Sequence, residues 1–255
     1  MLNIKIMILA SVMQFFSTVA SGGMQETAVI DGVFLQQLQK SADTEVRIEL
    51  VRTLQQTAPA NLRVTLEAIA LNSKEESRVR MEAMCALSGV ATKDSIPLLL
   101  DLLEDDLKLR RGYWACLIPV LGGVNDRRSI PLLTRIINLD QAGLIGMDHM
   151  AIEALASIGD EREALILAGK VHIEPVRLAV IKGLARIASI KSVNVFINAL
   201  QGAEDAEIAS AAMVGLHRLG QGALPELEKA LQGVAEGWDK LQRERIRQVI
   251  LKIGK

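Results

Sequence analysis

The sequence predicts an all-α protein, a right-handed α–α superhelical solenoid built from stacked helical hairpins. Half of its 255 residues are hydrophobic although aromatic residues make up only 3%. A core of Leu, Ile, Val, Ala and Met suits helices that pack closely through small side chains. One apolar motif also recurs six times at intervals of 29 to 38 residues. Repetition at such a period is typical of solenoids.

The N-terminal residues 1–20 are predicted to be a signal peptide. Lys5 and the chain amine precede a mostly apolar run over residues 6–19, and the small residues Thr18 and Ala20 fit a signal peptidase site. We therefore expect export to the periplasm or the extracellular space. An uncleaved N-terminal anchor stays open as an alternative, and it would be the only predicted contact with a membrane.

Residues 21–41 form an N-terminal segment, in which residues 29–38 are predicted to be a capping helix with Asp31 near its start. Residues 42–255 are predicted to form one repeat domain, because no linker rich in Pro, Gly or Ser interrupts them. A two-helix unit cannot bury its apolar face alone, so neighbouring units must stack into one continuous core.

The repeated motif describes the first helix of each hairpin. In every copy the first residue is apolar, the eighth is small and the ninth is Leu, and apolar residues at positions one, five, six and nine follow helical spacing. The small residue lets a neighbouring helix approach closely. The six copies begin at Val46, Val79, Leu109, Met147, Val176 and Ile208.

A turn and a second apolar helix follow the motif. Second helices are expected over residues 98–103, 132–137, 193–200 and 224–231, three of them opened by a proline that a first helical turn tolerates. Pro59 and Asn61 are expected to open the second helix of the first unit. Four glycines are expected to end first helices in the left-handed conformation, namely Gly89, Gly122, Gly159 and Gly220.

The C-terminal residues are predicted to cap the stack, because a solenoid needs a polar outer face at its end. The expected seam of this capping helix consists of Leu241, Ile246, Val249, Ile250 and Ile253.

The stretch that starts at Val79 and Arg80, with Ala83, Ala86 and Leu87 and then Asp94, Ile96, Pro97 and Leu99, resembles the HEAT repeat. Pro175, Val176, Arg177 and Leu184 resemble it too, and the resemblance extends over about residues 42–255. It departs from the pattern at Tyr113 and Asp148. The resemblance implies a solenoid that presents a surface to a partner protein.

No catalytic, cofactor-binding or metal-binding residues are predicted. His149, His172 and His217 lie in different units, whereas a metal site needs several converging ligands. The sequence lacks a phosphate-binding glycine loop and a nucleophile elbow. We therefore expect no enzyme activity, no cofactor and no small-molecule substrate. A net charge of −1 also speaks against a nucleic-acid partner.

Cys85 and Cys116 fall on adjacent predicted first helices. In an oxidising compartment two cysteines favour a disulfide. Bridging requires Cα atoms within about 7 Å, and the larger spacing of stacked helices favours buried free thiols instead. The sequence leaves both states open.

Four arginines share the second position of their repeats, namely Arg47, Arg80, Arg110 and Arg177. They form either a row of anion-binding side chains or a set of structural partners for acidic residues and backbone carbonyls. The second interpretation is favoured because exposed like charges in a row need partners. The candidate partner-binding residues are Arg110, Arg111 and Tyr113, because Arg and Tyr are enriched in binding hot spots. Trp114, at a position that is apolar in the other copies, is expected in the core.

The sequence thus predicts a non-catalytic scaffold or adaptor of the cell envelope, which binds an unidentified protein on its concave face. One alternative is a structural subunit of an envelope assembly. Another, suggested by the family resemblance, is a lyase-type enzyme related to the HEAT-like bilin lyases.

Overall fold

The computed structural model of the chain describes residues 41, 43–57, 62–139, 146–200, 205–232 and 240–254. The predicted signal peptide, the predicted capping helix at 29–38 and both Pro59 and Asn61 lie outside these ranges. The chain divides into two compact units, Met1–Leu98 and Leu99–Lys255, and the division falls inside one helix. No strand occurs in the described part of the chain, so the all-α class is confirmed.

The described part of unit 1 contains α3 (Thr44–Thr57), α4 (Arg63–Leu71) and α5 (Ser77–Ala86). Helix α3 packs on α5, and α4 also packs on α5. Asp43 starts α3 by accepting the backbone N–H groups of Glu45 and Val46. The 3₁₀ helices Leu87–Gly89 and Lys93–Ser95 then lead into α6 (Ile96–Leu109), which the unit boundary divides.

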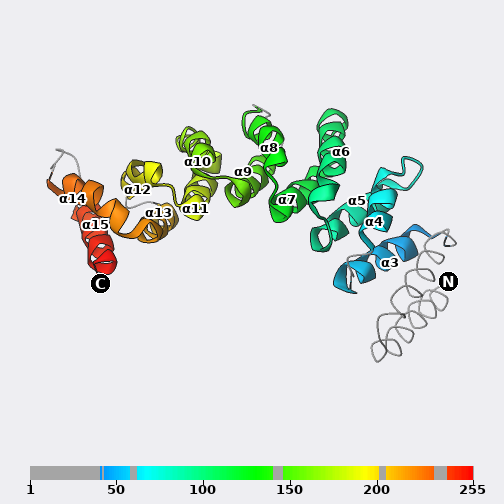
Figure 1. Cartoon of the computed structure of the whole chain (residues 1–255), viewed down its shortest axis with the longest axis horizontal. Coiled ribbons are helices and arrows are strands. Elements are labelled where there is room, and N and C mark those ends of the chain that lie inside the picture. The colour runs from blue at the N-terminus through cyan, green and yellow to red at the C-terminus, as the bar shows by residue number, and fades with distance from the viewer. Residues whose placement is uncertain are drawn as a thin grey trace, which may run out of the picture. The chain divides into compact units, whose positions relative to one another are not determined.

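Unit 2 repeats the hairpin along the chain. Its first helices are α7 (Trp114–Val124), α9 (Met147–Ile158), α11 (Arg177–Ile187) and α13 (Ala206–Leu219). Each of them packs on the next, α7 on α9, α9 on α11 and α11 on α13. Figure 1 shows the second helices α8 (Ile130–Ile137), α10 (Glu161–Ala168) and α12 (Val193–Ala199) together on one side of this row. The predicted stacking of hairpins is confirmed within unit 2, whereas the hand of the superhelix stays a prediction.

The last hairpin carries the C-terminal cap. Helix α14 (Leu224–Gln232) and helix α15 (Lys240–Ile253) pack on each other, and α15 also packs on α13. Ile246 and Val249 are fully buried, as the predicted seam requires, but Leu241 is 41% exposed. Gln242 and Arg245 of α15 donate hydrogen bonds to the carbonyls of Ile197 and Leu200 at the end of α12. The cap thus satisfies carbonyls that a helix C-terminus leaves without a partner.

Short polar side chains start the second helices. Thr92, Asp126 and Ser189 each accept the backbone N–H two residues ahead, and Asp160 forms a capping box with Glu163. Such caps satisfy the free N–H groups of a first helical turn and each contribute about 1 kcal/mol. These residues separate the first helix of a hairpin from its second helix, so they set where each hairpin turns.

The prediction for the glycines is right at one position and wrong at three. Gly220 has a φ of 58°, but Gly89, Gly122 and Gly159 do not have positive φ values. Among the described first helices, two do end at a left-handed residue that is not glycine, α7 at Asn125 with φ 56° and α11 at Ala188 with φ 54°. Gly122 instead lies inside α7 against the backbone of Ala154, where a Cβ would come within 2.9 Å of the Ala154 Cα. Its role is close packing of α7 on α9.

Candidate partner-binding site

The structure corrects the register of the third repeat. Leu109 was expected to open a first helix, but it is the last residue of α6 and is 54% exposed. The residue that occupies this position is Tyr113, which is 3% exposed and lies 34 residues after Val79 and 34 before Met147. Leu117, Ile118 and Leu121 then fill the buried positions five, six and nine. The irregular spacing of the third unit and its apparent excess length were consequences of the wrong register.

This shift explains where the predicted site residues lie. Arg110 and Arg111 are exposed residues of the loop between α6 and α7, rather than members of a first helix. Trp114 is only partly buried at the start of α7, so its predicted place in the core is wrong. Tyr113 is buried because its ring takes the position that Val or Met occupies in neighbouring repeats.

The loop is held by the buried carboxylate of Asp106, which is 2% exposed. Asp106 accepts the backbone N–H of Arg111 at 3.0 Å and that of Trp114 at 2.8 Å. The backbone N–H of Arg110 in turn donates to the carbonyl of Asp106 at 2.7 Å. A carboxylate at the N-terminus of α7 also interacts favourably with the helix dipole. One buried side chain thus closes α6, shapes the loop and opens α7.

The loop backbone adopts an unusual conformation. Arg110 has a φ of 52° and Gly112 a φ of 86°. A left-handed φ is unfavourable for an arginine, and such residues persist only where surrounding contacts impose them. Here the hydrogen bonds to Asp106 impose it. The two arginine side chains consequently start from a fixed backbone.

Tyr113 is buried beneath the loop and contacts the side chain of Arg111. The guanidinium of Arg111 lies 5.9 Å from the centroid of the Tyr113 ring, within the range of a cation–π interaction. Because the ring is buried, Tyr113 supports Arg111 and does not itself present a face to a partner. The surface group of the site comprises Leu109, Arg110 and Arg111, and we refer to residues 109–114 as the arginine loop.

A second candidate surface, which the sequence did not reveal, lies between α11 and α13. A groove of about 620 Å³ runs between these helices. Its lining includes the cationic residues Lys182, Arg186 and Arg218 and the apolar residue Val214, which is 47% exposed. The residues come from two repeats, so no local motif marks the groove.

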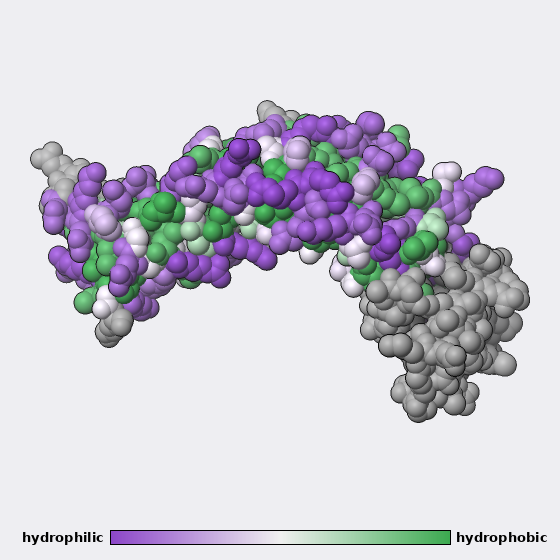
Figure 2. Space-filling view, in the orientation of Figure 1, coloured by the Kyte–Doolittle hydropathy of each residue, from purple (hydrophilic) through white to green (hydrophobic). Residues whose placement is uncertain are grey.

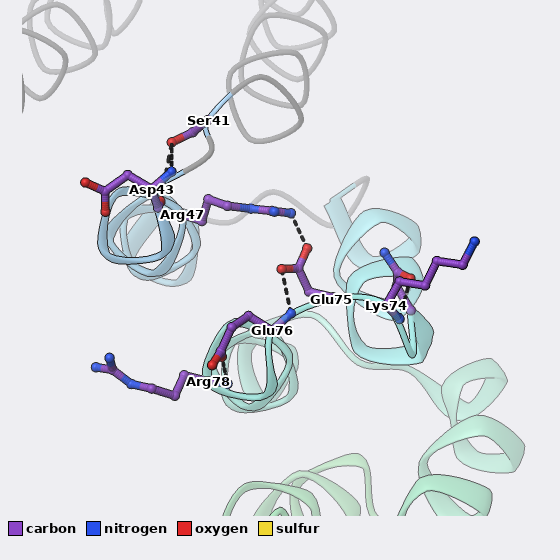
Figure 3. Close-up of polar contacts among 8 residues, drawn as sticks. Ser41, Asp43, Arg47, Lys74, Glu75, Glu76 and Arg78 are labelled. Atoms are coloured by element: carbon purple, nitrogen blue, oxygen red, sulfur yellow. Dashed lines mark hydrogen bonds and ion pairs between the residues drawn. The ribbon is translucent and has the colours of Figure 1, made fainter.

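Arginines in unit 1 serve as structural partners. Figure 3 shows Arg47 of α3 extended towards Glu75 in the turn between α4 and α5, where the two side chains form an ion pair. The Glu75 carboxylate, 4% exposed, also accepts the backbone N–H of Glu76. Arg80 is buried and its Nε donates to the carbonyl of Ala70 in the last turn of α4. These contacts confirm the favoured interpretation of the arginines for Arg47 and Arg80.

The cysteines differ from the favoured prediction. Both Cys85 and Cys116 are disulfide-bonded, so neither is a free thiol. The error came from comparing a Cα distance with a distance between helix axes. Cα atoms lie about 2.3 Å from the axis of their own helix, so facing residues of packed helices come much closer than the axes do.

The three histidines lie in different surroundings. Nε2 of His149 is 2.7 Å from the carbonyl oxygen of Pro175, His172 is exposed, and His217 is partly buried. Within the described ranges, no group of three His, Cys, Asp or Glu side chains is arranged to hold a metal ion. The helices described here include none long and apolar enough to cross a bilayer.

Comparison with known proteins supports the family resemblance. The family of HEAT repeats matches residues 32–117. The chain therefore carries HEAT repeats over residues 32–117. Among solved structures it is similar to the complex of CpcE and CpcF of the phycocyanin lyase from Nostoc sp. PCC7120, with 14% identity and a TM-score of 0.52 over 88% of this chain and 94% of that chain. At such low identity this similarity shows the fold alone.

Human deoxyhypusine hydroxylase in complex with glycerol is also similar, with 18% identity over 94% of this chain and 88% of that chain, but the TM-score is 0.39. The comparison with curated proteins finds no match to this chain.

These comparisons correct the prediction that the chain is not an enzyme. The phycocyanin lyase structure has a similar fold and belongs to an enzyme, so neither the fold nor the lack of a familiar motif supports a non-enzyme. The prediction failed because it treated missing sequence motifs as missing chemistry. A solenoid can assemble a site from separate repeats without any local motif, as the groove between α11 and α13 illustrates for a binding surface.

Proposed function

We propose that this protein binds a protein partner through its arginine loop. The observation that carries the proposal is the fixed presentation of Arg110 and Arg111 by the buried Asp106. A preorganised loop loses little conformational freedom when it binds, so more of the contact energy contributes to affinity. Solvent-exposed Leu109 adds an apolar contact beside the two charges. Arginine is one of the residues most enriched in binding hot spots.

The fold is consistent with such a role. Stacked hairpins provide a long surface whose residues come from many repeats. The HEAT-like phycocyanin lyase that resembles this chain was solved as a complex of two proteins, which supports an association with another chain here.

We also propose that the protein works after export. Residues 1–20 carry the features of a signal peptide. Both cysteines are disulfide-bonded, and disulfides persist mainly in oxidising compartments. Thiol labelling of intact source cells tests this part of the proposal. Cys85 and Cys116 should react with a maleimide only after reduction, and labelling without reduction would contradict export.

Affinity capture from an extract of the source cells tests partner binding. Wild-type protein is compared with the double variant Arg110→Ala/Arg111→Ala and with a charge-matched control, Arg162→Ala/Arg247→Ala, at two other exposed arginines. A partner should be retained by the wild type and the control and be lost with the loop variant. Circular dichroism of each variant shows that the fold is intact. Equal capture by all three proteins would reject the arginine loop as the binding site.

A further inference from the structure

The groove between α11 and α13 has a positive electrostatic character. Three cationic side chains, Lys182, Arg186 and Arg218, line it together with one carboxylate, Glu207. Lys182 forms an ion pair with Glu207 at 2.7 Å, so these two charges offset each other. The lining therefore keeps an excess of two positive charges.

The two remaining cationic side chains, Arg218 and Arg186, differ in their contacts with the rest of the protein. Nη1 of Arg218 donates to the carbonyl of Ala185 at 3.2 Å, which anchors that side chain across the groove to α11. Arg186 forms no ion pair with any of the residues that the structure describes, and its side chain is exposed. Arg186 is thus available for a carboxylate from outside, and Arg218 adds a charge whose position is fixed.

The floor of the groove is made by small and apolar residues. Ala185 and Ala211 are buried where α11 and α13 pack, and Val214 is 47% exposed at the surface. Figure 2 shows hydrophobic residues reaching the surface in the region of α12 and α13, surrounded by hydrophilic ones. A volume of about 620 Å³ is sufficient for a few side chains, though not for a folded domain.

We propose that this groove binds an acidic segment of a protein partner, with an apolar side chain on Val214 and carboxylates on Arg186 and Arg218. Arg recognises carboxylates through two parallel N–H donors, which makes such a pair directional. The proposal extends the proposed function, since it names a second contact on unit 2 and the chemistry of the partner segment. It does not require the arginine loop to be the first contact.

Fluorescence anisotropy with a labelled synthetic peptide tests the groove directly. The probe is a ten-residue peptide of Glu and Asp with one central Leu, and the same peptide with Lys in place of the acidic residues serves as the reversed-charge probe. The acidic peptide should bind saturably, with an affinity that falls as salt is added because the charges are exposed. The basic peptide should not bind.

Substitutions inside and outside the groove then test whether the acidic peptide binds there. Arg186→Glu should weaken binding at least about tenfold, since it replaces an attraction by a repulsion. Arg162→Glu on α10 makes the same charge change at an exposed site outside the groove and should change affinity less than about twofold. Val214→Asp should also weaken binding, whereas Leu165→Asp, at a residue 51% exposed on α10, should not.

Several outcomes would overturn the proposal. These are a lack of saturable binding, equal effects of Arg186→Glu and Arg162→Glu, and tight binding of a single-stranded RNA of the same length that Arg186→Glu abolishes while the peptide does not bind. The variant Arg110→Ala/Arg111→Ala should bind the acidic peptide like the wild type. Failure of the groove and failure of the arginine loop are therefore distinguishable.

Discussion

The carboxylate of Asp106, in the last turns of α6, accepts the backbone N–H of Trp114 at the start of α7 at 2.8 Å. Together with its bond to the N–H of Arg111, this contact determines where one hairpin element ends and the next begins. It also sets the backbone of the proposed binding site. Changes at Asp106 should therefore alter both stability and the arginine loop.

Replacing Asp106 by Asn should lower the free energy of unfolding by about 1–3 kcal/mol, because an amide supplies a weaker acceptor to two backbone donors in a buried place. Urea unfolding measures the loss, and hydrogen exchange of the Arg111 and Trp114 amides should become faster. Asp105→Asn is the neighbouring control. Its side chain is 67% exposed and forms a surface ion pair with Lys108 at 3.5 Å, so a loss below about 0.5 kcal/mol is expected. Equal losses in the two variants would contradict the role given to Asp106.

Gly215 tests the packing of α12 on α13. A Cβ at this position would come within 2.5 Å of the ring of Phe196, which is fully buried. Gly215→Ala should therefore cost about 1–3 kcal/mol of stability through overpacking. Gly123→Ala in α7 is the matched substitution, because a Cβ there meets nothing within 4 Å. It should stabilise the protein by about 0.5–1 kcal/mol, since Ala is a better helix former. A neutral Gly215→Ala would show that α12 and α13 do not pack as described.

Asp160 should contribute to folding stability, and this contribution should be lost at acid pH. Its pKa is lowered from 3.8 to about 2, first by the backbone N–H of Arg162 and then by the side chain of Arg127, with which it pairs at 2.7 Å. Because the folded-state pKa is lowered, this contribution is complete above pH 3.8 and disappears as the pH falls through about 2.

The pH dependence is measured by comparing wild-type protein with Asp160→Asn in denaturant titrations between about pH 6 and pH 2. The wild type should be the more stable protein at the upper end, and the difference should shrink towards the lower end. A difference that does not change with pH would show that the charge of Asp160 contributes nothing and that only the cap hydrogen bond matters.

His217 should make the folding stability depend on pH just below neutrality. Burial lowers its pKa below 6.5, and the charge of Lys252 lowers it further. The folded protein therefore binds this proton less readily than the unfolded chain does, so stability is complete above pH 6.5 and falls as the pH decreases below that value. His217→Gln should reduce this loss, whereas His172→Gln, at an exposed position, should leave it unchanged. Unfolding midpoints at about pH 7.5 and pH 5.5 decide between these outcomes.

The sequence predicted the hairpins well where the apolar spacing is unambiguous. Val79 lies in the first turn of α5, Met147 opens α9 and Val176 precedes α11, and these helices carry buried residues at the predicted positions. The third repeat was placed four residues too early, because Leu109 and Leu117 offer apolar residues at the same spacing as a correct copy. The buried contacts of Asp106 hold the chain where it leaves the helix after Leu109, and the sequence does not mark them.

The candidate sites were predictable to different degrees. Arg110 and Arg111 could be chosen from composition, but their fixed backbone depends on a carboxylate that the sequence does not mark as buried. The groove could not be predicted, because Arg186 and Val214 lie on different repeats and come together only through the packing of α11 on α13. The relative rotation of two packed helices is set by tertiary contacts, which no local pattern contains.

Site-specific photo-crosslinking tests the central claim, binding of a protein through the arginine loop, most directly. A photoreactive amino acid replaces Arg111 in one variant and Arg162 in the control, and both are irradiated in the source cells. The account predicts one discrete protein adduct from position 111 and none from position 162. Irradiation that leaves the Arg111 variant without any adduct, or that gives the same adducts from both positions, would contradict it.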